Sequence, residues 1–169
     1  IAGGGAPLHP RIVPVEPDRS ALKIPLQTLS SARRPILLVG LGVFWDHASD
    51  ELVALAERLG APVLTTSKCK GAIPEDHPLR AGCIIGGLIE RELVMQSDLI
   101  ITIGLDAIEL QPKPWPYDIP VISFSNTPSL EAVIPAEFEM VGNLKALLAG
   151  LAEFAPEGSG WGEGSAKTF

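Results

Sequence analysis

The residues LGAPVLTT at positions 59–66 join the end of a helix to the start of a buried strand. Ahead of them, apolar side chains recur at the i, i+3, i+4 and i+7 spacing of an amphipathic helix, at Leu52, Leu55, Ala56 and Leu59. Gly60 supplies the left-handed residue that closes such a helix. Residues 62–66 then form a short apolar run, which is typical of a strand buried on both faces of a parallel sheet.

The alternation of strands and helices continues on both sides of this stretch. Apolar runs predict further strands at 36–39, 99–103, 120–124 and 138–141. Helical spacing predicts further helices at 25–31, around 88–93 and at 144–151. Asp46 is a suitable N-terminal cap for the helix before Gly60, and Asn143 for the last helix.

Strands that alternate with helices require right-handed crossovers, which place helices on both faces of the sheet. The sequence therefore predicts an α/β fold: a Rossmann-like, doubly wound, mostly parallel sheet of five or six strands. Glycine and proline are frequent at both ends of the chain, which predicts a linker at 1–18, the Rossmann-like domain at 19–154 and a flexible C-terminal linker at 155–169. Ile1 in place of Met suggests a piece of a longer polypeptide.

Composition argues against several classes of partner. The formal net charge is −7 over 169 residues, with no run of Lys or Arg, so we expect no nucleic-acid binding. No apolar run reaches the roughly 20 residues of a membrane span, so we expect no membrane insertion. Cys69 and Cys83 are the only cysteines and have no zinc-finger spacing, so we expect no metal site and a cytoplasmic location.

Several short motifs occur together in the middle of the chain. They are GAPV at 60–63 with TT at 65–66, Gly71 with IPEDHPL at 73–79, and DLIITIG at 98–104. Their order and spacing resemble the central domain of thiamine-diphosphate-dependent enzymes, the group that includes acetohydroxyacid synthases and benzoylformate decarboxylases. The resemblance covers roughly 34–151.

That resemblance implies a domain without catalytic residues of its own. Enzymes of this group hold thiamine diphosphate and Mg²⁺ between two other domains, one with an activating glutamate and one with a GDG motif. Neither motif is present in this sequence. The resemblance thus implies, as partners, flanking thiamine-diphosphate-binding domains of the same polypeptide and a homo-oligomeric parent enzyme.

A ligand of an open α/β sheet binds beyond the carboxyl ends of the strands, where the strand order reverses. Relatives that hold FAD or ADP in the central domain use the loops at this edge. The corresponding candidates for cofactor binding are Gly40, Gly42, Thr65, Thr66, Gly104, Asp106, Ser125 and Thr127.

Three features of these loops argue against FAD or ADP. Trp45 occupies the third position of the GxGxxG pattern, which favours a tight turn and close helix packing over nucleotide binding as the explanation of Gly40 and Gly42. Asp106 stands where flavin-binding relatives have an arginine, and its carboxylate would repel a diphosphate. Ser125 and Thr127 replace an acidic pair that would accept bonds from ribose hydroxyls.

Other polar side chains have local explanations. His77 is expected to form local hydrogen bonds. Cys69 lies between Lys68 and Lys70, which would lower its thiol pKa if both ammonium groups approached it; otherwise it is an ordinary loop thiol. The proline-rich loop at 111–117 either contacts a neighbouring domain or shields the sheet.

The leading hypothesis is the central, non-catalytic domain of a thiamine-diphosphate-dependent lyase or transferase that cleaves or forms C–C bonds next to a carbonyl. This domain is structural in that hypothesis, with nucleotide binding left open. The alternative is a free-standing nucleotide-binding or regulatory Rossmann-like module. A third hypothesis is an interaction scaffold that binds no ligand.

Overall fold

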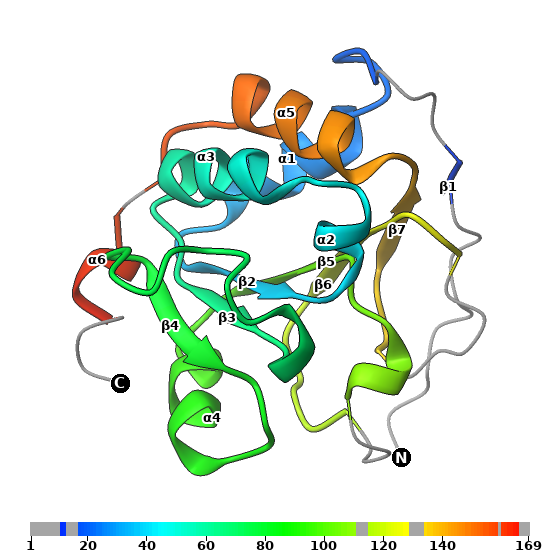
Figure 1. Cartoon of the computed structure of the whole chain (residues 1–169). Helices are drawn as coiled ribbons and strands as arrows, with labels where there is room; N and C mark the ends of the chain where they lie inside the picture. Colours follow the sequence, from blue (N-terminus) through cyan, green and yellow to red (C-terminus); the bar gives the residue numbers. More distant parts are fainter. Residues whose placement is uncertain (1–10, 13–16, 111–114, 129–133, 159, 166–169) are drawn as a thin grey trace.

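A parallel sheet in the order β1-β7-β6-β5-β2-β3-β4 forms the centre of the molecule in the computed structural model (Figure 1). The structure describes residues 11–12, 17–110, 115–128, 134–158 and 160–165. The strands are β1 (Arg11–Ile12), β2 (Pro35–Val39), β3 (Val63–Thr65), β4 (Arg80–Cys83), β5 (Leu99–Ile103), β6 (Val121–Ser125) and β7 (Phe138–Val141).

Helices lie between most of these strands and after β7. The α-helices are α1 (Lys23–Ser31), α2 (Gly42–Trp45), α3 (Ser49–Leu59), α4 (Leu88–Met95), α5 (Leu144–Phe154) and α6 (Gly162–Ser165). Two short 3₁₀ helices are η1 (Ser67–Cys69) and η2 (Ala107–Glu109). The longest helices, α3 and α5, have 11 residues, and no helix in the described part of the chain has the length and apolarity of a membrane span.

The strand order reverses between β2 and β5. From β2 the chain proceeds to β3 and β4 on one side, and then returns to β5, β6 and β7 on the other side. The result is a six-stranded parallel sheet that the two-residue β1 extends beyond β7. The prediction of a Rossmann-like α/β fold is confirmed, and the reversal marks the place where such folds bind ligands.

Helices cover the two faces of the sheet unequally, as Figure 1 shows. One face carries α1, α3 and α5, and alternate residues of β2, Leu37 and Val39, belong to the core beneath them. The other face carries α4, where Ile36 and Leu38 of β2 lie in a second core. The prediction of helices on both faces is therefore confirmed.

One of the two predicted helix caps is wrong. Asn143 caps α5 as predicted, since its side chain accepts a hydrogen bond from the Ala146 amide at 3.0 Å. Asp46 does not cap α3, because it is the C-cap residue of α2, and α3 begins only at Ser49 with Ala48 at its N-cap. Its carboxylate instead accepts a hydrogen bond from the Leu144 amide at 2.6 Å. Gly60 closes α3 in the left-handed conformation, at φ 55°, as predicted.

The strand β4 was not predicted from the sequence. Arg80–Cys83 is half-exposed along its length and lies at the edge of the sheet beside β3. Its register with β3 shifts between Val63 and Leu64, and Gly82 has φ 114°. An irregular edge strand that contains arginine and glycine has neither the apolar run nor the alternation that predicts a strand.

The described part of the predicted C-terminal linker lies against the end of α3 and the start of β2. The Gly158 amide donates to the Arg58 carbonyl at 2.9 Å, and the Gly162 amide donates to the Gly60 carbonyl at 3.0 Å. The Trp161 indole donates to the Pro35 carbonyl at 2.8 Å. Residues 159 and 166–169 of this segment, and 1–10 and 13–16 of the predicted N-terminal linker, lie outside the described residues.

Glu90 in the first turn of α4 holds the loop that precedes the helix. Its buried carboxylate accepts hydrogen bonds from the Ile85 amide, at 2.9 Å, and from the Gly87 amide. Burial opposes ionisation, but the bonds from Gly87 and Ile85 outweigh it, so the pKa of Glu90 lies below its ordinary value of 4.5. The ionised form therefore stabilises the folded state.

This pKa shift predicts how pH changes the stability of a Glu90→Gln variant. Above pH 4.5 the wild type should be more stable by about 1 kcal/mol, because glutamine loses the charge assistance of both bonds. The difference should shrink as pH falls through the lowered pKa, because the wild-type carboxylate is then protonated too. Urea unfolding of both proteins between pH 3 and pH 7 measures this. Glu92→Gln, on the exposed side of α4, is the control, and a pH-independent difference would contradict the role of the charge.

Candidate functional site

The loops that follow β2 and β5 are in contact where the strand order reverses. The Gly42 amide donates to the Gly104 carbonyl at 2.9 Å, and the Gly40 amide donates to the Ile103 carbonyl at 2.9 Å. A Cβ atom on Gly42 would lie 2.8 Å from the Gly104 Cα, and Gly104 has φ 58°. These three predicted site residues therefore allow two loops to pack closely, and the amides of Gly40 and Gly42 are already bonded.

The carboxylate of Glu109 lies at the centre of this edge. Its two oxygens accept hydrogen bonds from the Leu41 amide at 3.0 and 3.1 Å. Oε1 also accepts from the Asp106 amide at 3.1 Å, and Oε2 accepts from the Thr66 hydroxyl at 2.6 Å. Donors from the loops after β2, β3 and β5 thus converge on one half-buried carboxylate, in a set that we call the Glu109 cradle (Leu41, Thr66 and Asp106).

Asp106 and Glu109 form a reciprocal capping pair around η2. Asp106 Oδ1 accepts from the Ile108 amide at 2.9 Å, while Glu109 accepts from the Asp106 amide. The exposed Asp106 carboxylate is engaged in this turn, and Glu109 is the carboxylate that meets the loop after β2. Sequence reasoning singled out Asp106 and missed Glu109, although an acidic cap followed by glutamate three residues later is the known spacing of such a pair.

Thr65 and Thr66 point to different partners. Thr66, which is 1% exposed, donates its hydroxyl to Glu109. The hydroxyl of Thr65 lies 3.5 Å from the Gly82 carbonyl and 3.5 Å from the Cys83 sulfur, so it faces β4. Of the two predicted threonines, only Thr66 therefore reaches the crevice where the strand order reverses.

The Cys69 thiol lies beneath the Glu109 cradle. It is fully buried and donates to the Gly40 carbonyl at 3.0 Å. Burial, with smaller contributions from the charges of Glu109 and Cys83, raises the pKa of Cys69 to about 12. Both lysines are exposed whereas the thiol is buried, so of the two interpretations the one in which Lys68 and Lys70 lower this pKa does not hold. Cys69 is thus an unreactive thiol at neutral pH.

A second carboxylate joins the loop after β6 to α5. Asp46 accepts from the Asn126 side-chain amide at 3.3 Å, in addition to the Leu144 amide. Ser125, which is buried, donates its hydroxyl to Glu139 at 3.3 Å, whereas Thr127 is exposed. The bond that Ser125 makes therefore does not involve the Glu109 cradle.

The remaining polar and aromatic candidates have structural roles. His77 accepts from the Leu79 amide at 3.2 Å and lies 3.3 Å from Glu57, so its predicted local hydrogen bonding is confirmed. The rings of Trp115 and Tyr117 meet edge to face at 5.1 Å and pack on the α4 face of the sheet, where they shield it. Residues 111–114 of this loop lie outside the described residues.

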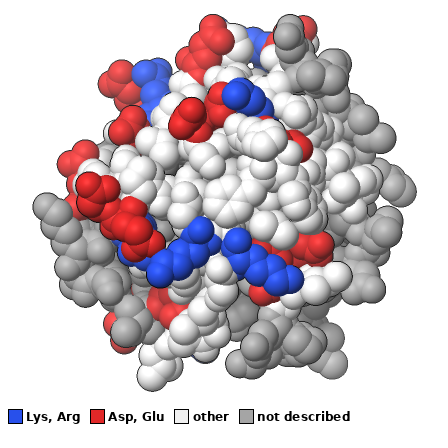
Figure 2. Space-filling view, viewed as in Figure 1, with Lys and Arg blue, Asp and Glu red and all other residues white. Residues whose placement is uncertain are grey.

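Within the described ranges, no group of three or more His, Cys, Asp or Glu side chains is placed to hold a metal ion. Figure 2 shows acidic side chains at several places on one face of the molecule, with basic side chains between them. Arg80 pairs with Glu75 at 2.9 Å, and Lys145 pairs with Glu51 at 3.5 Å. Basic groups are thus partly neutralised by acidic neighbours.

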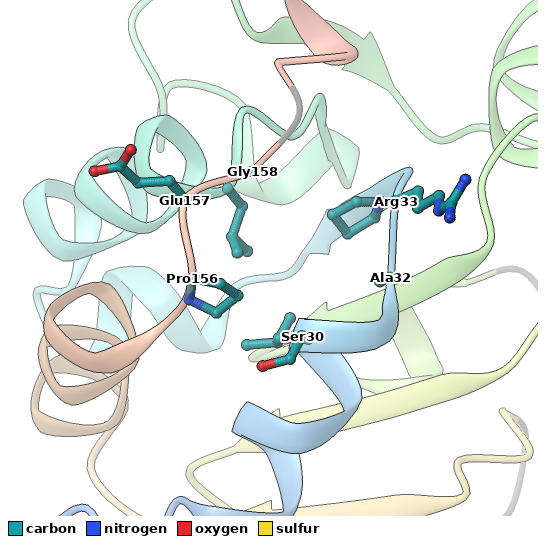
Figure 3. Close-up of a pocket in the computed structure, with 9 residues that line it drawn as sticks. Ser30, Ala32, Arg33, Pro156, Glu157 and Gly158 are labelled. Atoms are coloured by element: carbon teal, nitrogen blue, oxygen red, sulfur yellow. The ribbon is translucent and has the colours of Figure 1, made fainter.

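A shallow pocket lies at the opposite edge of the sheet from the cradle. Figure 3 shows Ser30 of α1 with Ala32 and Arg33 of the α1–β2 connection on one side and Pro156, Glu157 and Gly158 on the other. This edge holds the amino ends of the strands, whereas α/β folds bind ligands at the carboxyl ends. We assign no function to this pocket.

Residues 22–151 match the family model for the central domain of thiamine pyrophosphate enzymes. Among curated relatives, sulfoacetaldehyde acetyltransferase of Rhodobacter capsulatus is 42% identical over 90 residues, which are 52% of this chain and 15% of that protein. Acetolactate synthase of Mycobacterium avium is 30% identical over 144 residues, which are 82% of this chain and 23% of that protein. The chain thus spans less than a quarter of these relatives.

A solved structure gives the same result. Benzoylformate decarboxylase from Polynucleobacter necessarius superposes with a TM-score of 0.72 at 25% sequence identity. The match covers 88% of this chain and 29% of that one. Nearly the whole sheet and its helices therefore correspond to one part of a larger enzyme.

Proposed function

This chain belongs to the family of thiamine pyrophosphate enzyme central domains, as the sequence predicted, and from that membership we propose that its parent protein cleaves or forms C–C bonds next to a carbonyl. Relatives named as a 2-ketoarginine decarboxylase, a sulfoacetaldehyde acetyltransferase and an acetolactate synthase support the proposal. The observation that carries it is the family match over 22–151. The parent is then a lyase or a transferase.

Within that parent, this domain is non-catalytic. Its described residues do not fit thiamine diphosphate with its metal ion, because they offer no cluster of metal ligands and because the Leu41 amide and the Thr66 hydroxyl already bind Glu109. Thiamine diphosphate and Mg²⁺ would accordingly be held by flanking domains. The contribution of this domain is to position those domains, and we propose 19–154 as its extent.

The α4 side of the sheet is the surface that we propose for contact with flanking domains or with another subunit of a homo-oligomer. Ile85, Leu88 and Met95 are 69%, 79% and 55% exposed there. Large apolar side chains that are exposed to water favour burial against a partner. The free Cys69 and Cys83 support a reducing, cytoplasmic location for the parent.

The alternative of a free-standing nucleotide-binding module is not favoured. Such a module would need donors at the reversal point, and the described donors of the Glu109 cradle are bonded within the chain. FAD or ADP in this domain is likewise not favoured.

The experiment that tests the proposed function uses the full-length parent, purified without added cofactor. Small molecules released by denaturation are identified by mass spectrometry, and flavin is also sought by absorbance. We expect thiamine diphosphate without FAD or ADP. A nucleotide without thiamine diphosphate would overturn the proposal in favour of the binding module.

A further inference from the structure

We propose that the Glu109 cradle is an anion site that the chain fills with its own side chain, so that Glu109 excludes an external diphosphate from the point where the strand order reverses. The inference goes beyond the proposed function, since it concerns a binding site and does not depend on the reaction of the parent.

The first observation is the number of donors that meet one carboxylate. Two backbone amides and one hydroxyl, from Leu41, Asp106 and Thr66, bond the two oxygens of Glu109 over 2.6–3.1 Å. Converging backbone amides and a hydroxyl are also the donors that proteins present to phosphate groups. The carboxylate therefore takes the place that a phosphate group would need.

The second observation is the position of the cradle. It joins the loops that follow β2, β3 and β5, across the reversal of strand order. A side chain on Gly40 would lie 2.5 Å from Glu109 Oε1, so the absence of a Cβ atom lets the carboxylate approach the β2 loop. A ligand of this fold likewise needs to come close to the backbone of the first loop, but here the Glu109 carboxylate occupies that space.

The third observation is a second internal carboxylate at the same edge. Asp46 accepts hydrogen bonds from the Leu144 amide and the Asn126 side-chain amide. An anion bound beyond the ends of β6 and β7 would otherwise accept hydrogen bonds from these two donors. Two acidic side chains of the chain therefore satisfy donors on both sides of the reversal. Each is tethered, so it competes with an external anion at a high effective concentration.

Inorganic pyrophosphate is the probe that tests the inference. The chain and its Glu109→Ala variant are titrated with pyrophosphate by calorimetry, and the backbone amide resonances are followed by ¹⁵N NMR. We expect the variant to bind at least about tenfold more tightly than the wild type, because the tethered competitor is gone. The Leu41 and Asp106 amide resonances should shift on titration in the variant only.

Two further variants separate the cradle from other sites. Adding Thr66→Val to Glu109→Ala removes one donor and should reverse most of the gain in affinity. Glu92→Ala, which removes an exposed carboxylate on α4, should behave as the wild type and so corrects for the change in net charge. If Glu109→Ala does not fold, Glu109→Gln keeps the size of the side chain and should show a smaller gain at the same amides.

Three results would overturn the inference. The first is a folded Glu109→Ala or Glu109→Gln protein that binds pyrophosphate no more tightly than the wild type. The second is tighter binding without shifts of the Leu41 and Asp106 amide resonances. The third is a wild-type protein that binds pyrophosphate at those amides as tightly as the variant does. None of them touches the proposed function, because that function is tested on the cofactor content of the full-length parent.

Discussion

Replacing Gly104 with alanine is expected to lower the free energy of unfolding by about 3 kcal/mol. Gly104 has φ 58°, a left-handed conformation that costs a residue with a side chain about 1 kcal/mol or more. The added Cβ atom would also lie 2.9 Å from the Gly42 Cα and 2.9 Å from the Val43 nitrogen. These are backbone atoms, which cannot rotate away, so overpacking adds about 1–3 kcal/mol. Urea unfolding measures the loss.

Gly160→Ala is the matched control for Gly104→Ala. Gly160 also has a left-handed φ, 68°, but an added Cβ atom there would meet only the Glu163 side chain, at ordinary contact distances of 3.9 and 4.0 Å. It should therefore show the conformational cost of about 1 kcal/mol without the cost of overpacking. Equal losses in the two variants would mean that the contact between the β2 and β5 loops contributes nothing to stability.

The fold was predictable where a single element has a strong pattern of its own. β2 and β5 are apolar runs that are buried at every position, so the sequence places them to within one residue. α5 carries Leu144, Leu147, Leu148 and Leu151 on one buried stripe, with Asn143 as its cap. β4 has no such pattern, because a half-exposed edge strand needs neither burial nor alternation.

The site was predictable only in part, because Glu109, its central side chain, bonds to residues that are far away in the sequence. Glu109 binds the Leu41 amide, 68 residues earlier, and Asp46 binds the Leu144 amide, 98 residues later. No local pattern encodes such a contact, since it depends on which loops the strand order brings together. The glycines could be predicted because a tight turn after a strand depends only on residues that are adjacent in the sequence.

Cys69 shows how sequence neighbours mislead about electrostatics. Lys68 and Lys70 are adjacent in the chain, but η1 turns the cysteine inward and leaves both lysines outside. Burial has the largest effect on the thiol, followed by the charges of Glu109 and Cys83, which come from other elements. Their effect and that of burial raise the pKa, the reverse of what two lysines would do.

Replacing Phe124 with alanine is expected to lower the free energy of unfolding by about 4 kcal/mol, the range typical of a buried phenylalanine. Phe124 is fully buried on the face that α1, α3 and α5 cover, near the carboxyl end of β6. Its carbonyl also accepts the Gly104 amide at 2.8 Å, so the backbone of Phe124 is bonded to the start of the loop that carries Asp106 and Glu109. Thermal and urea unfolding measure the loss.

Ile108→Ala is the control for Phe124→Ala, because Ile108 is 81% exposed on η2 beside Glu109. A surface substitution should change stability by no more than about 0.5 kcal/mol. A loss below about 1 kcal/mol for Phe124→Ala would contradict a tightly packed core beneath β6, since the cavity would then have collapsed at little cost. The crevice loops could not in that event depend on this core for their position, and their contact would rest on the bonds from Gly40 and Gly42 to the β5 side together with the bonds to Glu109.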